Sequence, residues 1–287
     1  MPGFGFTPEN PDDDENKNPF SNFGDIFRQF SGMGLNLPGL MASLSGQTSP
    51  TALSKQMIRD ISKKFLTAHG EVPVGVSDLV AAQEAFSIAD IWINDATVFP
   101  PLPIPDTCVL SRRDWIDSTL AGWEELAKPL VEGMSQAMSA MLNENLGDGD
   151  ENIQIPGLAI PVNISKSTIA SVMGTFMSSL ISTQLGQTIG QLSTTVTGSN
   201  DVALPLTEPI RPQLIPQNVT LWGKGLEIDE TEIRIYLALR EVAAARLFAA
   251  TPWLREYIRT SIATYGKGIR VDISAMTQQA EIGRAHV

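Results

Sequence analysis

Histidine and cysteine are almost absent from this chain of 287 residues. They occur only as His69, His286 and Cys108. A single cysteine excludes an intrachain disulfide and fits a reducing compartment, where we expect Cys108 to be a small buried apolar residue. Two histidines exclude a metal or catalytic site built from several imidazoles within this chain. A site made of carboxylates alone is not excluded.

Several other signatures are also missing. The chain has no G-x-S-x-G elbow and no glycine-rich phosphate loop followed by lysine. The acidic loop at 148–151 lacks the glycine and glutamate spacing of an EF-hand. The N-terminus has neither the basic nor the apolar region of a secretory signal, so we expect a cytoplasmic protein. The net charge of -12 without a lysine or arginine cluster argues against nucleic-acid binding, and a protein or peptide partner is left open.

Composition divides the chain into three parts. Residues 1–20 are acidic and rich in glycine and proline, which predicts a disordered lead. The apolar content of the chain is enough for one large domain or two modest ones, and we expect residues 21–276 to form a single helical domain. The last seven residues, Glu281 to Val287, are what the string GAG-ATC-GGA-AGA-GCA-CAC-GTC encodes, which resembles a common sequencing adapter. We therefore expect 277–287 to be a non-native tail on a truncated reading frame.

The positions of helix-capping residues and of helix-breaking glycine and proline predict a mainly α fold of several helices. Pro-rich extended connectors join them, and little or no sheet is expected. Pro129 is expected to kink or restart the third helix, and His69 to interact with the free carbonyls at the end of the first. The connectors are expected at 99–105, 153–162 and 201–225, with a short extended arm at 269–273. The expected helices span 50–69, 77–94, 111–146, 166–196, 229–250 and 252–265.

Residues 169–192 carry no charge over a length that would cross a bilayer. Serine, threonine, glutamine and glycine are frequent there, however, and no basic flank or aromatic belt accompanies them. These features favour a buried core helix over the alternative of a membrane span. Gly186 and Gly190, four residues apart, are typical of close helix packing.

The helix from Asp229 to Ala250 is the most clearly specified. Asp229 is a strong N-cap, with Glu232 three residues on. Arg240 falls inside the apolar stripe, so we expect a carboxylate or backbone carbonyls against it; the alternative is an edge position from which it reaches water. The helical spacing predicts that stripe from Ile233, Tyr236, Leu237, Ala244, Leu247 and Phe248.

The same helix carries part of a zinc-peptidase motif. In H-E-x-x-H two histidines bind the metal from one helix face and the glutamate activates water. Glu241 occupies the glutamate position here. The histidine positions are Arg240 and Ala244, and neither side chain can bind zinc.

Around these positions the chain resembles a bacterial family of zincin-like, zinc-dependent metallopeptidases. The resemblance rests on YLALRE at 236–241, RLF at 246–248, PWL at 252–254 and GIRVD at 268–272. Weaker similarity covers DVALPL at 201–206 and the helix around Gly186, and the whole extends over about residues 20–276.

One branch of that family has H-E-x-x-H, and the branch this chain resembles has R-E-x-x-H. Ala244 replaces the remaining histidine of that motif, and Ala250 stands where a further histidine often occurs. Zinc is implied by the resemblance alone, and no cofactor is evident in this chain. We expect a catalytically degenerate member. The alternatives are an active metallohydrolase with ligands in a missing C-terminal part, and a non-enzymatic helical protein with a binding or structural role.

Overall fold

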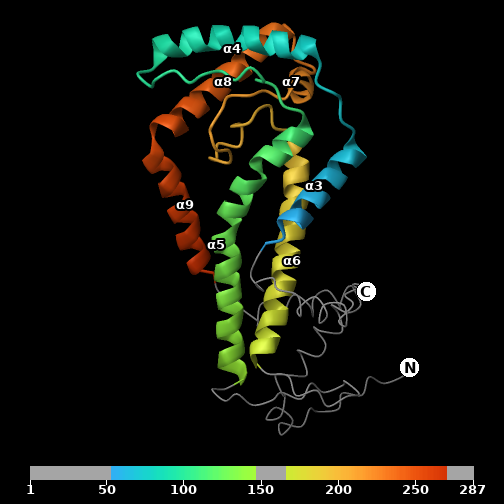
Figure 1. The fold of residues 1–287 in the computed structure, drawn as a ribbon, viewed down its shortest axis with the longest axis vertical. Coiled ribbons are helices and arrows are strands. Elements are labelled where there is room, and N and C mark those ends of the chain that lie inside the picture. Colours follow the sequence, from blue (N-terminus) through green and yellow to red (C-terminus); the bar gives the residue numbers. More distant parts are fainter. Residues whose placement is uncertain (1–52, 147–165, 270–287) are drawn as a thin grey trace, which may run out of the picture. The chain divides into compact units, whose positions relative to one another are not determined.

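The computed structural model describes residues 53–146 and 166–269, which are mainly helical (Figure 1). In these ranges β structure is confined to isolated bridges, so the predicted mainly α fold with little or no sheet is confirmed there. The connector expected at 153–162 lies outside the described residues. The chain folds as two compact units, and the contacts that position the site lie in the larger one, residues 51–137 with 174–287. The helices are α3 (Lys55–His69), α4 (Val76–Ala96), α5 (Arg112–Leu146), α6 (Lys166–Ser193), α7 (Pro216–Gly223), α8 (Glu230–Ala250) and α9 (Pro252–Lys267).

Short-range capping explains where several helices begin and end. α3 begins after Ser54, whose hydroxyl accepts a hydrogen bond from the Met57 amide at 3.2 Å. The predicted start at residue 50 was therefore wrong, because a second serine nearer the apolar residues caps the helix. Gly70 ends α3 as predicted, with a φ of 78° that favours glycine. At the predicted start of α5, the Asp114 carboxylate accepts from both the amide and the hydroxyl of Ser111, at 3.1 and 2.7 Å.

Three expectations about helix breakers need correction. Residues 216–223 form α7 inside the predicted extended connector, because Pro216 takes the first helical position, where its missing N–H costs nothing. α5 runs through Pro129 as one helix, so the expected restart is wrong, whereas the expected kink stays a prediction. Gly266 does not end α9, which continues to Lys267. A Cβ on Gly266 would approach the Pro129 carbonyl oxygen to 2.5 Å, so this glycine lets α9 pack directly on α5.

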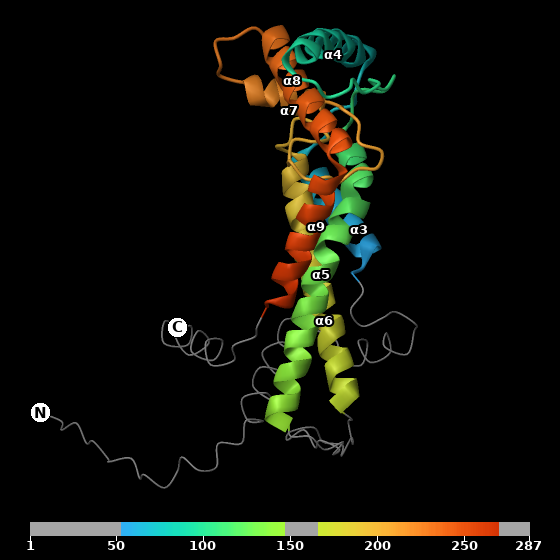
Figure 2. The same ribbon diagram turned by 90° about the vertical axis from the view of Figure 1, so that its left-hand side faces the viewer.

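The larger unit holds two apolar clusters. In one, α4 lies beside α8, as Figures 1 and 2 show, and alanines of α4 allow close approach to Leu237, Ala238 and Val242 of α8. Cys108 is fully buried in this cluster, as predicted, and burial raises the pKa of its thiol. The other cluster joins α3, α5 and α6 through Ile58, Leu66, Trp115, Ile116, Leu120 and Ile189.

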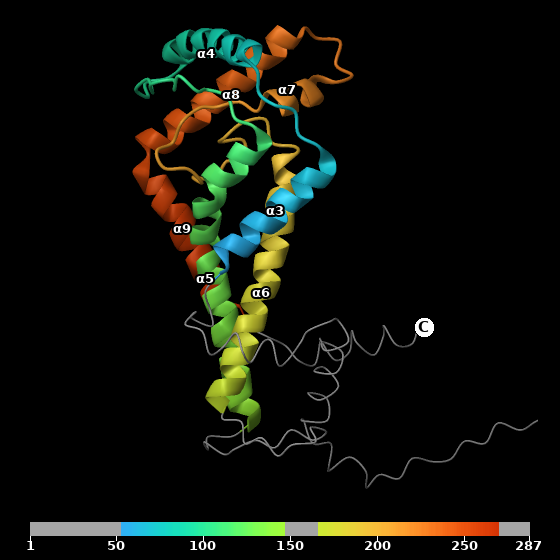
Figure 3. The same cartoon turned by 45° about the vertical axis from the view of Figure 1, so that its right-hand side comes forward.

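Helix α6, which contains the uncharged stretch 169–192, packs against α3, which runs obliquely across it in Figure 3. A Cβ on Gly186 would come within 2.9 Å of the Ile61 Cβ, and one on Gly190 within 2.8 Å of the Phe65 Cβ. The Ser62 hydroxyl donates to the Gly186 carbonyl at 2.9 Å. The predicted close packing at the two glycines is therefore confirmed. No helix in the described ranges has the length and apolar character needed to cross a bilayer.

Candidate functional site

The buried face of α8 differs from the predicted stripe. Ile233, Leu237 and Phe248 are buried as expected, but Tyr236 is 50% exposed and Leu247 37% exposed. The buried face instead includes Ala238, Glu241, Val242, Ala245 and Arg246. The prediction was wrong because it ranked residues by polarity, whereas two of the buried polar side chains have partners from elsewhere in the chain.

Glu241 is the centre of the site and is only 3% exposed. Its Oε1 accepts from the backbone amide of Asn200 at 2.9 Å. Its Oε2 lies 3.1 Å from that amide, 2.9 Å from the Asn200 side-chain nitrogen and 3.1 Å from the Ser199 hydroxyl. The side chain is therefore enclosed by hydrogen-bonding groups from residues 199 and 200.

Those groups lie on a loop, residues 197–201, held by backbone hydrogen bonds to the 213–215 segment. The Ser199 amide donates to Gln213 at 3.0 Å, and the Ile215 amide donates to Thr197 at 2.8 Å. Gly198 is required within the loop, because a Cβ there would overlap Oε1 of Glu241. The carboxyl and the loop backbone thus fit against each other without space for an added methyl group.

Burial dominates the electrostatics of Glu241. Removal from water disfavours the charged form more than the hydrogen bonds from Asn200 and Ser199 favour it. The negative charge of Asp201 acts in the same direction as burial. Together these effects raise the pKa of Glu241 to about 7.

Arg240 lies on the outer side of α8. Its Nη2 is 2.9 Å from Oδ1 of Asp201, so the expected carboxylate partner is present. The expected burial is wrong, because the Arg240 side chain is 47% exposed and that of Asp201 is 17% exposed. Asp201 Oδ2 accepts from the amide and the hydroxyl of Thr197, at 2.8 and 3.0 Å. Asp201 thus retains two donors whether or not Arg240 is present.

Zinc does not fit the motif positions. Arg240 brings a positive charge, Ala244 has no donor atom, and the oxygens of Glu241 already accept hydrogen bonds. Over 53–146 and 166–269, no three or more His, Cys, Asp or Glu side chains gather in a group able to hold a metal ion.

His69 lies at the end of α3, as predicted, where its Nδ1 is 2.9 Å from the Phe65 carbonyl oxygen. His286 is outside the described residues.

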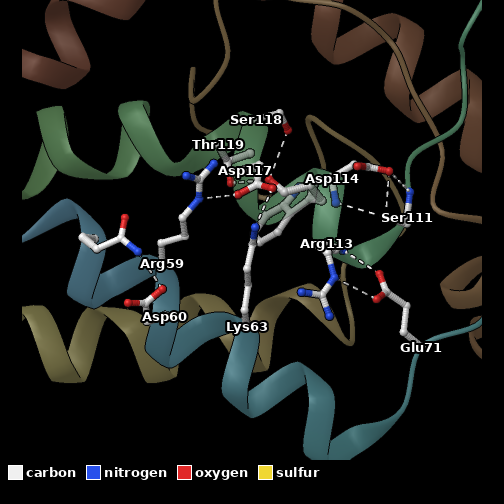
Figure 4. Close-up of polar contacts among 12 residues, drawn as sticks. Arg59, Asp60, Lys63, Glu71, Ser111, Arg113, Asp114, Asp117, Ser118 and Thr119 are labelled. Carbon is white, nitrogen blue, oxygen red and sulfur yellow. Dashed lines mark hydrogen bonds and ion pairs between the residues drawn. The ribbon is translucent and has the colours of Figure 1, made fainter.

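A second polar cluster joins α3 to α5 (Figure 4). Asp117 accepts from the Arg59 Nε at 2.7 Å and from the Lys63 Nζ at 2.8 Å. Burial opposes ionisation of Asp117, but these cations outweigh it and lower the pKa of the carboxyl. Glu71 accepts from the amide of Arg113 at 3.0 Å and from its Nε at 3.2 Å. Asp117 thus links α5 to α3, and Glu71, which follows the end of α3, is bonded to the first turn of α5.

Sequence reasoning missed the roles of Ser199 and Asn200 and the ion pair of the buried Arg246 with the partly exposed Asp90. Residues 197–201 are all turn-forming types, which predicts a loop but not its contact with a helix some 40 positions later. No signal in the sequence indicated the burial of Arg246 either, because hydrophobic periodicity ranks it as a surface residue, whereas the structure places it on the buried side of α8.

Comparison with known proteins gives one finding. A family model described as zincin-like metallopeptidase matches residues 55–285, well over half of the chain. No curated protein and no solved structure matches the sequence.

Proposed function

Because the chain belongs to the zincin-like metallopeptidase family, we propose that it is a member without peptidase activity, in which the motif helix has a structural role. The remaining function is binding or structural support, with a protein or peptide as partner. A cytoplasmic location is part of the proposal, and the free, buried thiol of Cys108 supports it.

The observation that carries this proposal is the enclosure of Glu241. A general base must come within hydrogen-bond distance of the water that it activates. Glu241 is 3% exposed, and a loop residue donates to each of its oxygens. A water molecule reaching this carboxyl would have to displace Asn200 or Ser199.

The neighbouring positions support the same proposal. At the position of the first metal-binding histidine, Arg240 places a guanidinium that pairs with Asp201. A divalent cation beside this group would be repelled. Ala244 removes the second ligand altogether.

The test measures zinc content and peptidase activity of the full chain. We expect less than stoichiometric zinc and no hydrolysis of an unfolded protein substrate, for the parent chain and for Glu241→Gln alike. Glu232→Gln is the matched control, because Glu232 is an exposed glutamate on the same helix.

The opposite result would favour the alternative of an active metallohydrolase. One mole of zinc per chain, with hydrolysis abolished by Glu241→Gln but not by Glu232→Gln, would overturn the proposal. In that case the metal ligands would come from outside the described residues.

A further inference from the structure

The short polar contacts around Glu241 require one proton more than is present when Glu241 is ionised. The Ser199 hydroxyl carries one proton but lies close to two oxygens, the Arg211 carbonyl at 2.6 Å and Glu241 Oε2 at 3.1 Å. A carbonyl oxygen can only accept, so the 2.6 Å contact requires the Ser199 proton. With Glu241 ionised, the contact between Ser199 and Oε2 would then join two oxygens with no proton between them.

We propose that Glu241 is a carboxylic acid in this structure, that it donates its proton to Ser199 Oγ, and that loss of this proton loosens residues 197–201 from α8. Every short contact then has a donor. Glu241 donates to Ser199, and Ser199 donates to the Arg211 carbonyl. The Asn200 amide donates to Oε1 at 2.9 Å, and the Asn200 side chain donates to the Arg211 carbonyl at 3.0 Å.

The charges around the site agree with a neutral acid. Asp201, on the same loop, bears a negative charge that opposes ionisation and is paired with Arg240. On α8 and α4, Arg246 is paired with Asp90. The group that Arg211 directs at Ser199 and Asn200 is its backbone carbonyl, which is an acceptor and carries no net charge.

Ionisation of Glu241 would affect more than one contact. With Ser199 still donating to the Arg211 carbonyl, the oxygen of Ser199 and the charged oxygen of Glu241 would face each other with no proton between them, and a buried charge would replace a neutral group. The same loop carries Asp201, which holds Arg240. Residues 197–201 therefore form a latch that is closed when Glu241 is protonated and weakened when it is ionised.

The pH range follows from burial, which raises the pKa of Glu241 from 4.5 to about 7. A raised pKa in the folded state means that folding favours the protonated form. Its contribution to stability is complete below pH 4.5 and is lost as the pH rises through about 7. The latch therefore weakens as the pH rises through about 7.

The decisive experiment follows the side-chain carboxyl of Glu241 by NMR titration, with Glu241→Gln used to assign its signal. Ser199→Ala shifts the titration midpoint of Glu241 in opposite directions, depending on whether Ser199 accepts a proton from Glu241 or donates one to it. If Ser199 accepts from the acid, its removal destabilises the neutral form and lowers the titration midpoint by about one pH unit, the equivalent of one ordinary hydrogen bond. If Ser199 donates to a carboxylate, its removal raises the midpoint, and the proposal is wrong.

Glu241→Gln supplies a second, independent readout. The glutamine NH₂ can donate to Ser199 as the acid does, and it does not titrate. We expect this variant to keep its melting temperature at pH 6 and to lose the decline between pH 6 and 8, whereas Glu232→Gln keeps that decline. A parent chain whose Glu241 titrates near 4.5 would overturn the proposal even if the glutamine variant fails to fold. Neither zinc nor peptidase activity enters these measurements, so this proposal and the proposed function fail separately.

Discussion

Arg240 and Glu241 are adjacent in sequence but lie in opposite environments. Arg240 is an exposed cation paired at the surface, and Glu241 is a buried acid enclosed by a loop. The energetic weight of each residue depends on its exposure and not on the strength of its charge. An exposed ion pair contributes little, whereas a buried polar group without its partners costs much.

Replacement of Arg240 should therefore change the stability of the protein only slightly. We expect Arg240→Ala and Arg240→Met each to lower the free energy of unfolding by about 1 kcal/mol or less, because the side chain is largely in water and Asp201 keeps its bonds from Thr197. Chemical denaturation of both variants measures this. A loss of about 3 kcal/mol or more would mean that the pair behaves as a buried one.

The pair of Arg246 and Asp90 should behave differently. The Arg246 side chain is fully buried, and its Nε and Nη1 have no hydrogen-bond partner. Asp90→Ala should lower the free energy of unfolding by about 3–5 kcal/mol, because it leaves a buried guanidinium without a counter-charge. Arg246→Met should cost much less, since it removes the charge together with its unsatisfied nitrogens. Equal losses from the two variants in urea unfolding would contradict this account.

At the scale of elements, glycines set the distances between helices. Gly186 and Gly190 bring α6 against α3, and Gly266 brings α9 against α5. In each place the neighbouring atom belongs to a helix, so an added methyl group would have to move that helix or distort it.

Gly190→Ala tests this packing. Alanine favours a helix over glycine by about 1 kcal/mol, but a Cβ here would approach the Phe65 Cβ to 2.8 Å. We expect the clash to dominate and the free energy of unfolding to fall by about 1–3 kcal/mol. Gln187→Ala, at an exposed position of the same helix, should change it by less than about 0.5 kcal/mol in parallel melts. A Gly190→Ala variant as stable as this control would show that the two helices can separate at no cost.

The ends of most helices could be predicted from the sequence because caps act within one turn. Gly70, the Ser111 and Asp114 box, and Asp229 each end or begin a helix where local chemistry indicated it. The restart predicted at Pro129 and the helix end predicted at Gly266 were wrong, because tertiary packing retains both helices through residues that usually break them.

The candidate site was predictable only in part. The missing histidines and the place of Glu241 on a helix follow from the motif. Which side of α8 is buried does not, because that depends on the contact between Glu241 and a loop far away in sequence. Hydrophobic periodicity ranks Glu241 and Arg246 as surface residues, and their burial depends on partners that periodicity does not include.

At the scale of the whole molecule, the family match shows which family the chain belongs to, and the residues at the motif positions carry the proposal that this member lacks peptidase activity. The match covers residues 55–285, yet Arg240 and Ala244 stand where metal ligands would be needed. Family membership does not by itself establish activity, because a fold depends on many packed residues whereas the chemistry of H-E-x-x-H depends on its two histidines and its glutamate.

The C-terminal residues provide a test at this scale. If residues 281–287 are part of a non-native tail, as their sequence predicts, they were not selected together with the fold and have no reason to complement its surface. Deleting them should leave the melting temperature unchanged and the free energy of unfolding within about 0.5 kcal/mol of the parent chain. A clear destabilisation would show that these residues pack against the fold and belong to the protein.

The loop and α8 meet through two consecutive residues on each side. Asn200 holds Glu241, and Asp201 holds Arg240. Each residue added to a helix rotates the remainder of that helix by about 100°, so one insertion or deletion between Glu230 and Arg240 would misalign both contacts at once. Length variation in evolution should therefore be confined to the connector before Asp229. The spacing from that cap to Glu241 should stay fixed even in lineages where the identity of the motif residues has drifted.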